Sequence, residues 1–185
     1  MKPTDILKAE HRGIEQMLEV VRAGADRLAR GEEVPPELFP QAVDFFRDFA
    51  DRCHHGKEER LLFARLADRG VPVNGGPIGV MLAEHEQGRG HIRGMQEALD
   101  RLARGDRGAV TELAGHAEAY VELLRAHIQK ENNVLFPMAD RLLSAEEQAE
   151  LEREFERVER EEMGEGVHER YHEMLHELSA QVLAR

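Results

Sequence analysis

The sequence that decides the fold is His127-Ile-Gln-Lys-Glu131-Asn-Asn-Val-Leu-Phe-Pro137. His127 and Glu131 are four residues apart, so on a helix their side chains lie one above the other on the same face. Imidazole and carboxylate groups are common ligands of first-row metals, and two of them converging from one helix can bind one cation. The remaining ligands of such a site must come from neighbouring helices.

Two segments of the chain repeat. Residues 57–63 (KEERLLF) are echoed 73 positions later by residues 130–136 (KENNVLF), and residues 9–11 (AEH) are echoed 74 positions later by residues 83–85 (AEH). This self-similarity predicts two related helical hairpins, each with one histidine on its first helix and a His-x-x-x-Glu pair on its second. The candidate metal ligands are His11, His54, Glu58, His85, His127 and Glu131.

Clusters of glycine, proline and turn-forming residues divide the chain into helices. The intervening segments predict four long helices over about residues 4–28, 37–67, 78–103 and 110–136. Short connections make successive helices antiparallel neighbours, which gives an up-down-up-down four-helix bundle. Pro137 should end or kink the fourth helix.

Additional helices are predicted after the bundle. Ser144 and Glu147 form the pattern of a capping box and predict a short fifth helix. Gly164 and Gly166 separate that helix from a final one over about residues 167–183.

The composition favours an all-α fold, because straight-chain residues dominate and β-branched and aromatic residues are few. At 185 residues the chain is long enough for one substantial core. We expect residues 1–143 to form the four-helix bundle and residues 144–185 to form a C-terminal helical extension packed on the same domain.

The six candidate ligands lie on the apolar faces of their helices. His11, for example, interrupts a stripe of apolar residues that runs from Leu7 to Leu28. Buried histidines and carboxylates are costly unless they are paired, and a metal would explain them. Because imidazole suits iron and a carboxylate can bridge two cations, four neutral histidines and two glutamates predict a bridged di-iron centre with two Fe ions.

The second helix offers two registers for its His-x-x-x-Glu pair, His54 with Glu58 or His55 with Glu59. Helical periodicity favours the first, because His54 shares its face with apolar residues whereas acidic residues precede His55 on its own face. The internal repeat also aligns His54 with His127. It stays open whether the side chains of Glu15, His55, Glu59 or Tyr120 reach the site.

Charge, apolar runs and cysteine content limit the classes of partner and the cellular compartment that are expected. The formal net charge of -12 disfavours nucleic acid and anionic membrane surfaces. No apolar run approaches the roughly 18 residues of a membrane span, and residues 1–13 lack the apolar core of a signal peptide. With a single cysteine, Cys53, the chain is expected to be cytoplasmic and to need no membrane.

A further histidine cluster lies near the C-terminus. His168, His172 and His176 fall at four-residue steps among glutamates. They could form a second, weaker metal site or a solvated helix face, and their role stays open together with that of the C-terminal helices.

At these residues the sequence resembles the bacterial hemerythrin-like, or HHE cation-binding, family, and within it is similar to the di-iron proteins named for repair of iron centres. The resemblance covers about residues 4–140. It rests on His54-x-x-x-Glu58 leading to Leu62-Phe63, on the stretch from Gly76-Pro77 to Glu84-His85, and on residues 127–137.

The resemblance implies a four-helix bundle with a non-haem di-iron site, two bridging glutamates and an open coordination position for O₂, NO or peroxide. Oxygen-carrying hemerythrins have a second histidine four residues after the third-helix ligand, where this chain has Arg89. One iron is therefore expected to have one protein ligand fewer, which makes reversible O₂ transport an unfavoured function.

Three functions are compatible with these features. The first is a di-iron protein that binds, senses or detoxifies O₂, NO or peroxide. The second is an iron-donating repair factor or a peroxide-decomposing enzyme, so whether the chain is an enzyme stays open. The third is a metal-free helical interaction module. The cellular metal, the physiological ligand and the association with a second copy or a partner protein stay open as well.

Overall fold

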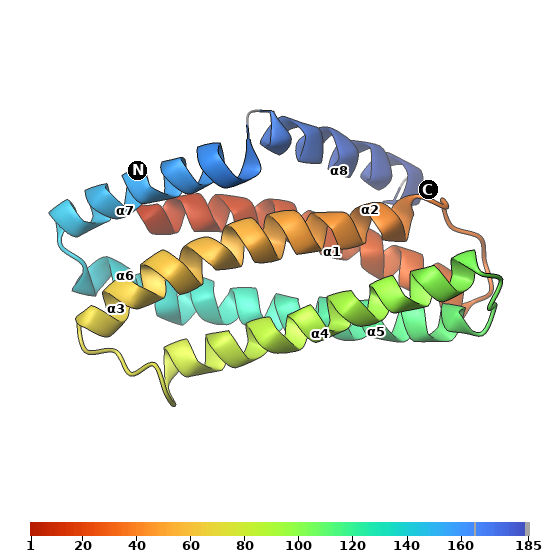
Figure 1. Cartoon of the computed structure of the whole chain (residues 1–185), viewed down its shortest axis with the longest axis horizontal. Helices are drawn as coiled ribbons and strands as arrows, with labels where there is room; N and C mark the ends of the chain where they lie inside the picture. The colour runs from red at the N-terminus through yellow and green to blue at the C-terminus, as the bar shows by residue number, and fades with distance from the viewer. Residues whose placement is uncertain (165, 184–185) are drawn as a thin grey trace.

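Four long helices lie side by side in the computed structural model, which describes residues 1–164 and 166–183 (Figure 1). Each runs antiparallel to the one before it, so the predicted all-α, up-down-up-down bundle is confirmed. Among the described residues there is no β-strand. The helices in order are α1 (Pro3–Ala29); α2 (Leu38–Phe45), η1 (Phe46–His55), η2 (Glu58–Leu62) and α3 (Phe63–Asp68); α4 (Pro77–Ala103); and α5 (Ala109–Lys130), η3 (Glu131–Leu135) and α6 (Phe136–Leu142).

The second and fourth helices contain π-helical segments, labelled η, in which a backbone N–H bonds to the carbonyl five residues earlier rather than four. The Phe63 N–H reaches the Glu58 carbonyl in the second helix, and the Phe136 N–H reaches the Glu131 carbonyl in the fourth. The two hairpins thus share a π turn that starts at the glutamate of each His-x-x-x-Glu pair. Such turns are frequent at functional sites.

Pro137 does not end the fourth helix, which continues to Leu142. A proline inside an α-helix clashes with the carbonyl four residues earlier and leaves it without a donor. Here the preceding turn is π-helical and Pro137 lies at the start of α6, where it is tolerated. Of the two outcomes expected at Pro137, an end or a kink, the helix therefore does not end there.

Two apolar clusters fill the bundle, one toward each end. One contains Leu7, Leu62, Ile78 and Leu135. Within the four long helices, the other includes Ile14 to Ala25 on the first, Leu38 to Ala50 on the second, Ile92 to Ala98 on the third and Ala109 to Ile128 on the fourth. On all four helices, the predicted metal ligands lie at or next to the boundary between these clusters. The core is therefore divided by one polar layer.

The C-terminal extension consists of α7 (Ala145–Val158), η4 (Glu159–Met163) and α8 (Val167–Leu183) and packs along α1 (Figure 1). Leu151 and Phe155 of α7 join the cluster around Leu7, and Leu175 and Leu178 of α8 join the other cluster. Ser144 caps α7 with the predicted capping box. Within the described residues, none of the helices has the length and apolarity needed to cross a bilayer.

Candidate metal centre

Seven buried side chains meet in the polar layer between the two apolar clusters. Their ligand atoms form two groups that share Glu58, and within each group all of these atoms lie within 4.8 Å of one another. The six residues predicted from the sequence are all present, together with His55. We call these seven residues the ligand layer: His11, His54, His55, Glu58, His85, His127 and Glu131.

The first group contains His11, His54, Glu58 and Glu131, which come from α1, the second helix and the fourth helix. The Nε2 atom of His11 lies 3.2 Å from Glu131 Oε2, and the Nε2 atom of His54 lies 3.4 Å from Glu58 Oε1. Neither Nε2 atom forms a hydrogen bond with any residue that the structure describes. Both imidazoles therefore point lone-pair positions into a space bordered by two carboxylates.

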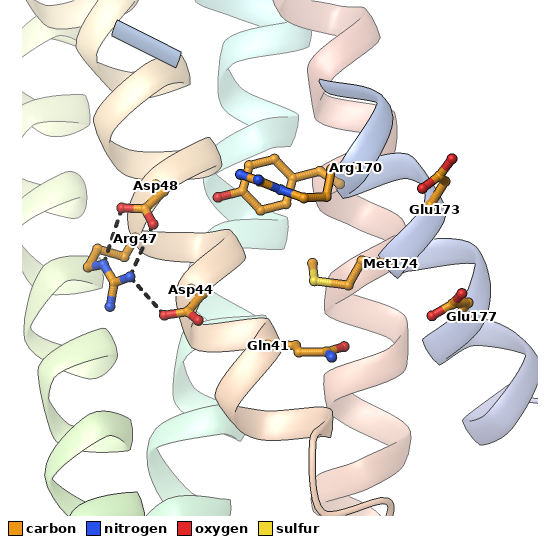
Figure 2. A pocket seen from close by; sticks show the side chains of 9 residues that line it. Gln41, Asp44, Arg47, Asp48, Arg170, Glu173, Met174 and Glu177 are labelled. Carbon is orange, nitrogen blue, oxygen red and sulfur yellow. Dashed lines mark hydrogen bonds and ion pairs between the residues drawn. The ribbon is translucent and has the colours of Figure 1, made fainter. Parts of the chain in front are cut away.

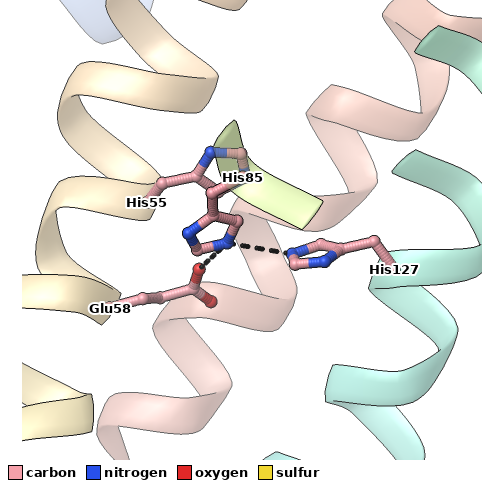
Figure 3. A group of neighbouring side chains, drawn as sticks. All are labelled: His55, Glu58, His85 and His127. Carbon is pink, nitrogen blue, oxygen red and sulfur yellow. Dashed lines mark hydrogen bonds and ion pairs between the residues drawn. The ribbon is translucent and has the colours of Figure 1, made fainter. Parts of the chain in front are cut away.

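The second group contains His55, Glu58, His85 and His127, which converge from the second, third and fourth helices (Figure 3). The Nε2 atom of His85 lies 3.1 Å from His127 Nε2 and 3.5 Å from Glu58 Oε2. Glu131 Oε1 lies 3.2 Å from His127 Nε2. Each glutamate therefore lies close to histidines of both groups, as a carboxylate that bridges two cations must.

The outer nitrogens of two histidines are held by glutamates from the repeated AEH segments. Glu10 Oε2 accepts from His54 Nδ1 at 2.8 Å, and Glu84 Oε2 accepts from His127 Nδ1 at 2.9 Å. Because an ionised carboxylate can only accept, each Nδ1 must carry the proton, which leaves Nε2 free to bind a cation. Lys57 binds Glu10 and Lys130 binds Glu84, so the repeat extends to the ion pairs behind the histidines.

The other histidines also have acceptors on their outer nitrogens. Asn132 Oδ1 accepts from His11 Nδ1 at 2.9 Å, and Glu59 Oε1 accepts from His85 Nδ1 at 2.7 Å. Asp51 Oδ1 lies 3.3 Å from His55 Nδ1. Such partners fix the tautomer and the ring orientation of metal-binding histidines.

Within the described part of the chain, the two central carboxylates, Glu58 and Glu131, have no hydrogen-bond partner at any of their four oxygens. Burial and the neighbouring charge of Glu131 raise the pKa of Glu58 well above its usual range. Burial also opposes ionisation of Glu131, but His127 and His11 outweigh it and lower the pKa of Glu131. Orphaned buried carboxylates are costly, and a divalent cation between them would neutralise the repulsion, so the residues present fit a metal.

The histidines are mostly poised in the neutral form that binds metals. Burial lowers the pKa of His54 to about 4, against the hydrogen bond from its ring to Glu10. Burial and neighbouring imidazoles lower the pKa of His55 well below its usual range, and burial lowers that of His85. The pKa of His127 is raised, because Glu131 and Glu84 outweigh its burial.

His55 is the residue of the ligand layer that periodicity did not favour. The residue is 4% exposed and its ring stacks on that of His85. Residues 46–55 are π-helical, and because a π turn contains more residues than an α turn, adjacent side chains such as His54 and His55 can face the same side. The doubled histidine was the available signal for this residue.

The position of Arg89 led to the expectation of one ligand fewer, but the second group contains three imidazoles because His55 supplies one from another helix. Arg89 instead binds Asp51 at 2.9 Å and Glu59 at 2.7 Å. These are the two carboxylates beside the outer nitrogens of His55 and His85. Arg89 therefore positions the carboxylates at the outer nitrogens of His55 and His85 and does not take the place of a metal ligand.

The remaining residues left open by the sequence lie outside the two groups. Glu59 reaches a ligand only through its hydrogen bond to His85, Glu15 is half-buried on α1, and Tyr120 is fully buried with its ring 4.6 Å from that of Phe46. Neither His172 nor His176 belongs to a candidate metal group in the described part of the chain. The side chain of His168 lies outside the described residues.

A polar groove of about 450 Å³ lies between the second helix and α8, away from the ligand layer (Figure 2). Charged side chains line it, and Arg47 pairs with Asp44 and Asp48 at its edge. None of these residues belongs to the two candidate metal groups among the described residues. The groove therefore adds no ligand to the centre.

Comparisons with known proteins agree with this geometry. Residues 2–139 match the model of the hemerythrin HHE cation binding domain. The chain is 26% identical over 145 residues to the uncharacterized protein Rv1995 of Mycobacterium tuberculosis, covering 78% of this chain and 56% of that protein. It is 32% identical over 90 residues to the iron-sulfur cluster repair protein YtfE of Dickeya chrysanthemi, covering 48% of this chain and 41% of that protein.

The chain thus spans about half the length of the curated relatives it matches. It has no significant match among solved structures. The family match nevertheless covers every residue of the ligand layer, whose donors are those of a cation site. The chain is therefore a metal-binding protein that belongs to the hemerythrin HHE cation-binding domain family.

Proposed function

We propose that the ligand layer binds two iron ions bridged by Glu58 and Glu131, and that this centre binds, senses or detoxifies O₂, NO or peroxide. The observation that carries the proposal is the pair of orphaned carboxylates between two sets of inward-facing imidazoles. Imidazole suits iron, and the name of the Dickeya relative also refers to iron.

The protein contributes geometry and seclusion. All seven residues of the ligand layer are at most 4% exposed, which favours a ligand of only a few atoms. The outer acceptors hold the imidazole Nε2 atoms toward the centre, and the apolar clusters on both sides limit the entry of water. Bound iron would supply the redox chemistry toward a small oxidant.

Donation of iron to damaged iron-sulfur centres is a second candidate function, favoured by the similarity to a protein with that name. Peroxide decomposition is the enzymatic alternative. Anaerobic incubation of the iron-loaded protein with an apo iron-sulfur protein would distinguish the two, since donation depletes iron from this chain whereas peroxide turnover leaves the iron in place.

The experiment that tests the proposal is elemental analysis with ultraviolet-visible spectroscopy of the wild type, Glu131→Ala and the control Glu122→Ala. Glu122 is an exposed glutamate of α5. We expect about two iron ions per chain in the wild type and the control, and near-ultraviolet charge-transfer bands that weaken in Glu131→Ala. Substoichiometric metal that anaerobic iron does not restore would reject the centre and leave a metal-free interaction module.

A further inference from the structure

The Lys–Glu ion pairs behind His54 and His127 differ in their exposure to solvent. The Lys57 side chain is 0% exposed and that of its partner Glu10 is 5% exposed. The equivalent Lys130 is 44% exposed and its partner Glu84 is 15% exposed. The same ion pair is therefore sealed behind His54 and open to solvent behind His127.

The C-terminal extension seals the first pair. Lys57 Nζ donates to Glu159 Oε1 of η4 at 2.8 Å and lies 5.6 Å from the ring centroid of Phe155 in α7. A buried ammonium is costly unless it is paired, and Glu10 and Glu159 supply two carboxylates. Lys57 therefore ties the extension to the bundle.

The ion pair between Lys57 and Glu159 is connected by hydrogen bonds to the candidate ligand His54. From Glu159 the contacts run to Lys57, then to Glu10, and then from Glu10 Oε2 to His54 Nδ1. On the other side, the contacts from His127 run to Glu84 and end at the half-exposed Lys130. Among the residues that the structure describes, only the first group of ligands is connected to the extension in this way.

Glu10 has room to leave its position. A cavity of about 240 Å³ lies against Glu10, Glu159 and His172, at the junction of α1 with the extension. Since close packing does not confine the carboxylate on that side, its contacts with Lys57 and His54 hold it. Without Lys57 in place, Glu10 can swing into this space and release the His54 ring.

We infer that Lys57 and Glu159 are positioning residues through which the C-terminal extension retains the cation bound by His11 and His54, so that the two cations leave the centre at different rates. The inference rests on the proposed binuclear site. A departing cation requires its imidazole to turn away, and fixing the outer nitrogen of His54 opposes that motion. The cation bound by His85 and His127 has no such cover and leaves first.

Release of iron to an excess of a ferrous chelator, measured anaerobically by stopped flow, tests this inference. We expect two phases of about one iron each in the wild type. Glu159→Ala and Lys57→Met should accelerate the slow phase by about 10-fold or more. Lys130→Met, the matched variant of the repeat, should change only the fast phase, and Glu156→Ala on the exposed face of α7 should change neither.

Unchanged far-ultraviolet circular dichroism would show that each variant folds, and Glu159→Ala removes a side chain that is 33% exposed, so it spares the core. Two irons leaving in one phase, or a slow phase that Glu159→Ala does not accelerate, would overturn the inference while the stoichiometry upholds the proposed centre. A wild-type protein without stoichiometric iron would overturn both.

Discussion

His55 and His85 stack face to face, with ring centroids 3.8 Å apart and ring planes inclined by 15°. They come from different helices, and both rings border Glu58 and His127 (Figure 3). In the other half of the repeat, the position of His55 is taken by Ile128. The two groups of ligands are therefore chemically unequal, with three imidazoles in one and two in the other.

Substitution of His55 tests this inequality. His55→Gln should weaken binding of one iron by more than the roughly 10–100-fold typical of losing an outer hydrogen-bond partner, because a ligand itself is lost. The second iron should bind with nearly unchanged affinity. Anaerobic titration calorimetry would measure both affinities, with His116→Gln as the control histidine. Two unaffected sites would show that His55 is not a ligand.

The side-chain amide of Asn132 should raise the affinity for the iron at His11 and His54. Asn132→Leu removes the acceptor of His11 Nδ1. It should weaken the binding of a cation at His11 and His54 by about 10–100-fold. Asn133→Leu is the matched control, because the exposed Asn133 side chain donates to Gln129 within its own helix. Equal losses in the two variants would point to a general helix effect instead.

Removing the central carboxylate of Glu58 should stabilise the metal-free protein. Glu58 is 0% exposed and its oxygens have no hydrogen-bond partner among the described residues, so Glu58→Leu removes a desolvated group next to Glu131. We expect the free energy of unfolding in urea with chelator to rise by about 1–4 kcal/mol, while binuclear binding is lost. A fall in that free energy would mean that the orphaned carboxylate is compensated in the folded apoprotein.

The stability of the metal-free protein should depend on His54 between pH 6.5 and 4. Burial lowers the folded-state pKa of His54 from 6.5 to about 4, so in this window the unfolded chain binds more protons. The contribution of His54 to stability is therefore complete above pH 6.5 and is lost as the pH falls toward 4, by about 3 kcal/mol.

Urea unfolding with chelator across this pH range, for the wild type and His54→Gln, would isolate the effect from the other titrating groups. The variant should show the flatter profile. Parallel profiles would place the folded-state pKa of His54 near its unfolded value.

The cap of α7 should have a measurable effect on stability. Ser144 Oγ accepts from the Glu147 N–H at 3.2 Å, and Glu147 Oε2 accepts from the Ser144 N–H at 2.8 Å. Ser144→Ala should cost about 1 kcal/mol. For a chain of this size, that is a fall of about 2–4 °C in Tm by calorimetry. Ser144→Asp, which keeps an acceptor, should retain most of the stability.

The helices and six members of the ligand layer could be predicted because they follow regular periodicity. His11, for example, interrupts a stripe of apolar residues, and His127 and Glu131 occupy one face at a spacing of four. The repeat then placed His54 at the position that corresponds to His127, and His85 at the position that corresponds to His11. The structure brings all six together with the burial that these patterns indicate.

Features that depend on local departures from the α-helix or on contacts between distant segments could not be predicted. His55 faces inward because its helix is π-helical, and Pro137 is accommodated for a related reason. The capping box at Ser144 locates the start of α7 but carries no information about its packing. The burial of Lys57 beneath Phe155 and Glu159 therefore emerges only from the tertiary structure.

The π turns at Glu58 and Glu131 set a condition for transplanting this centre into a designed protein. A π turn amounts to one residue inserted into an otherwise regular helix. An idealised bundle that copied the seven side chains but not the two insertions would rotate the helix beyond each glutamate by about 100°, one residue of an α-helix. A successful graft must therefore copy backbone irregularity along with chemistry, in both hairpins at once.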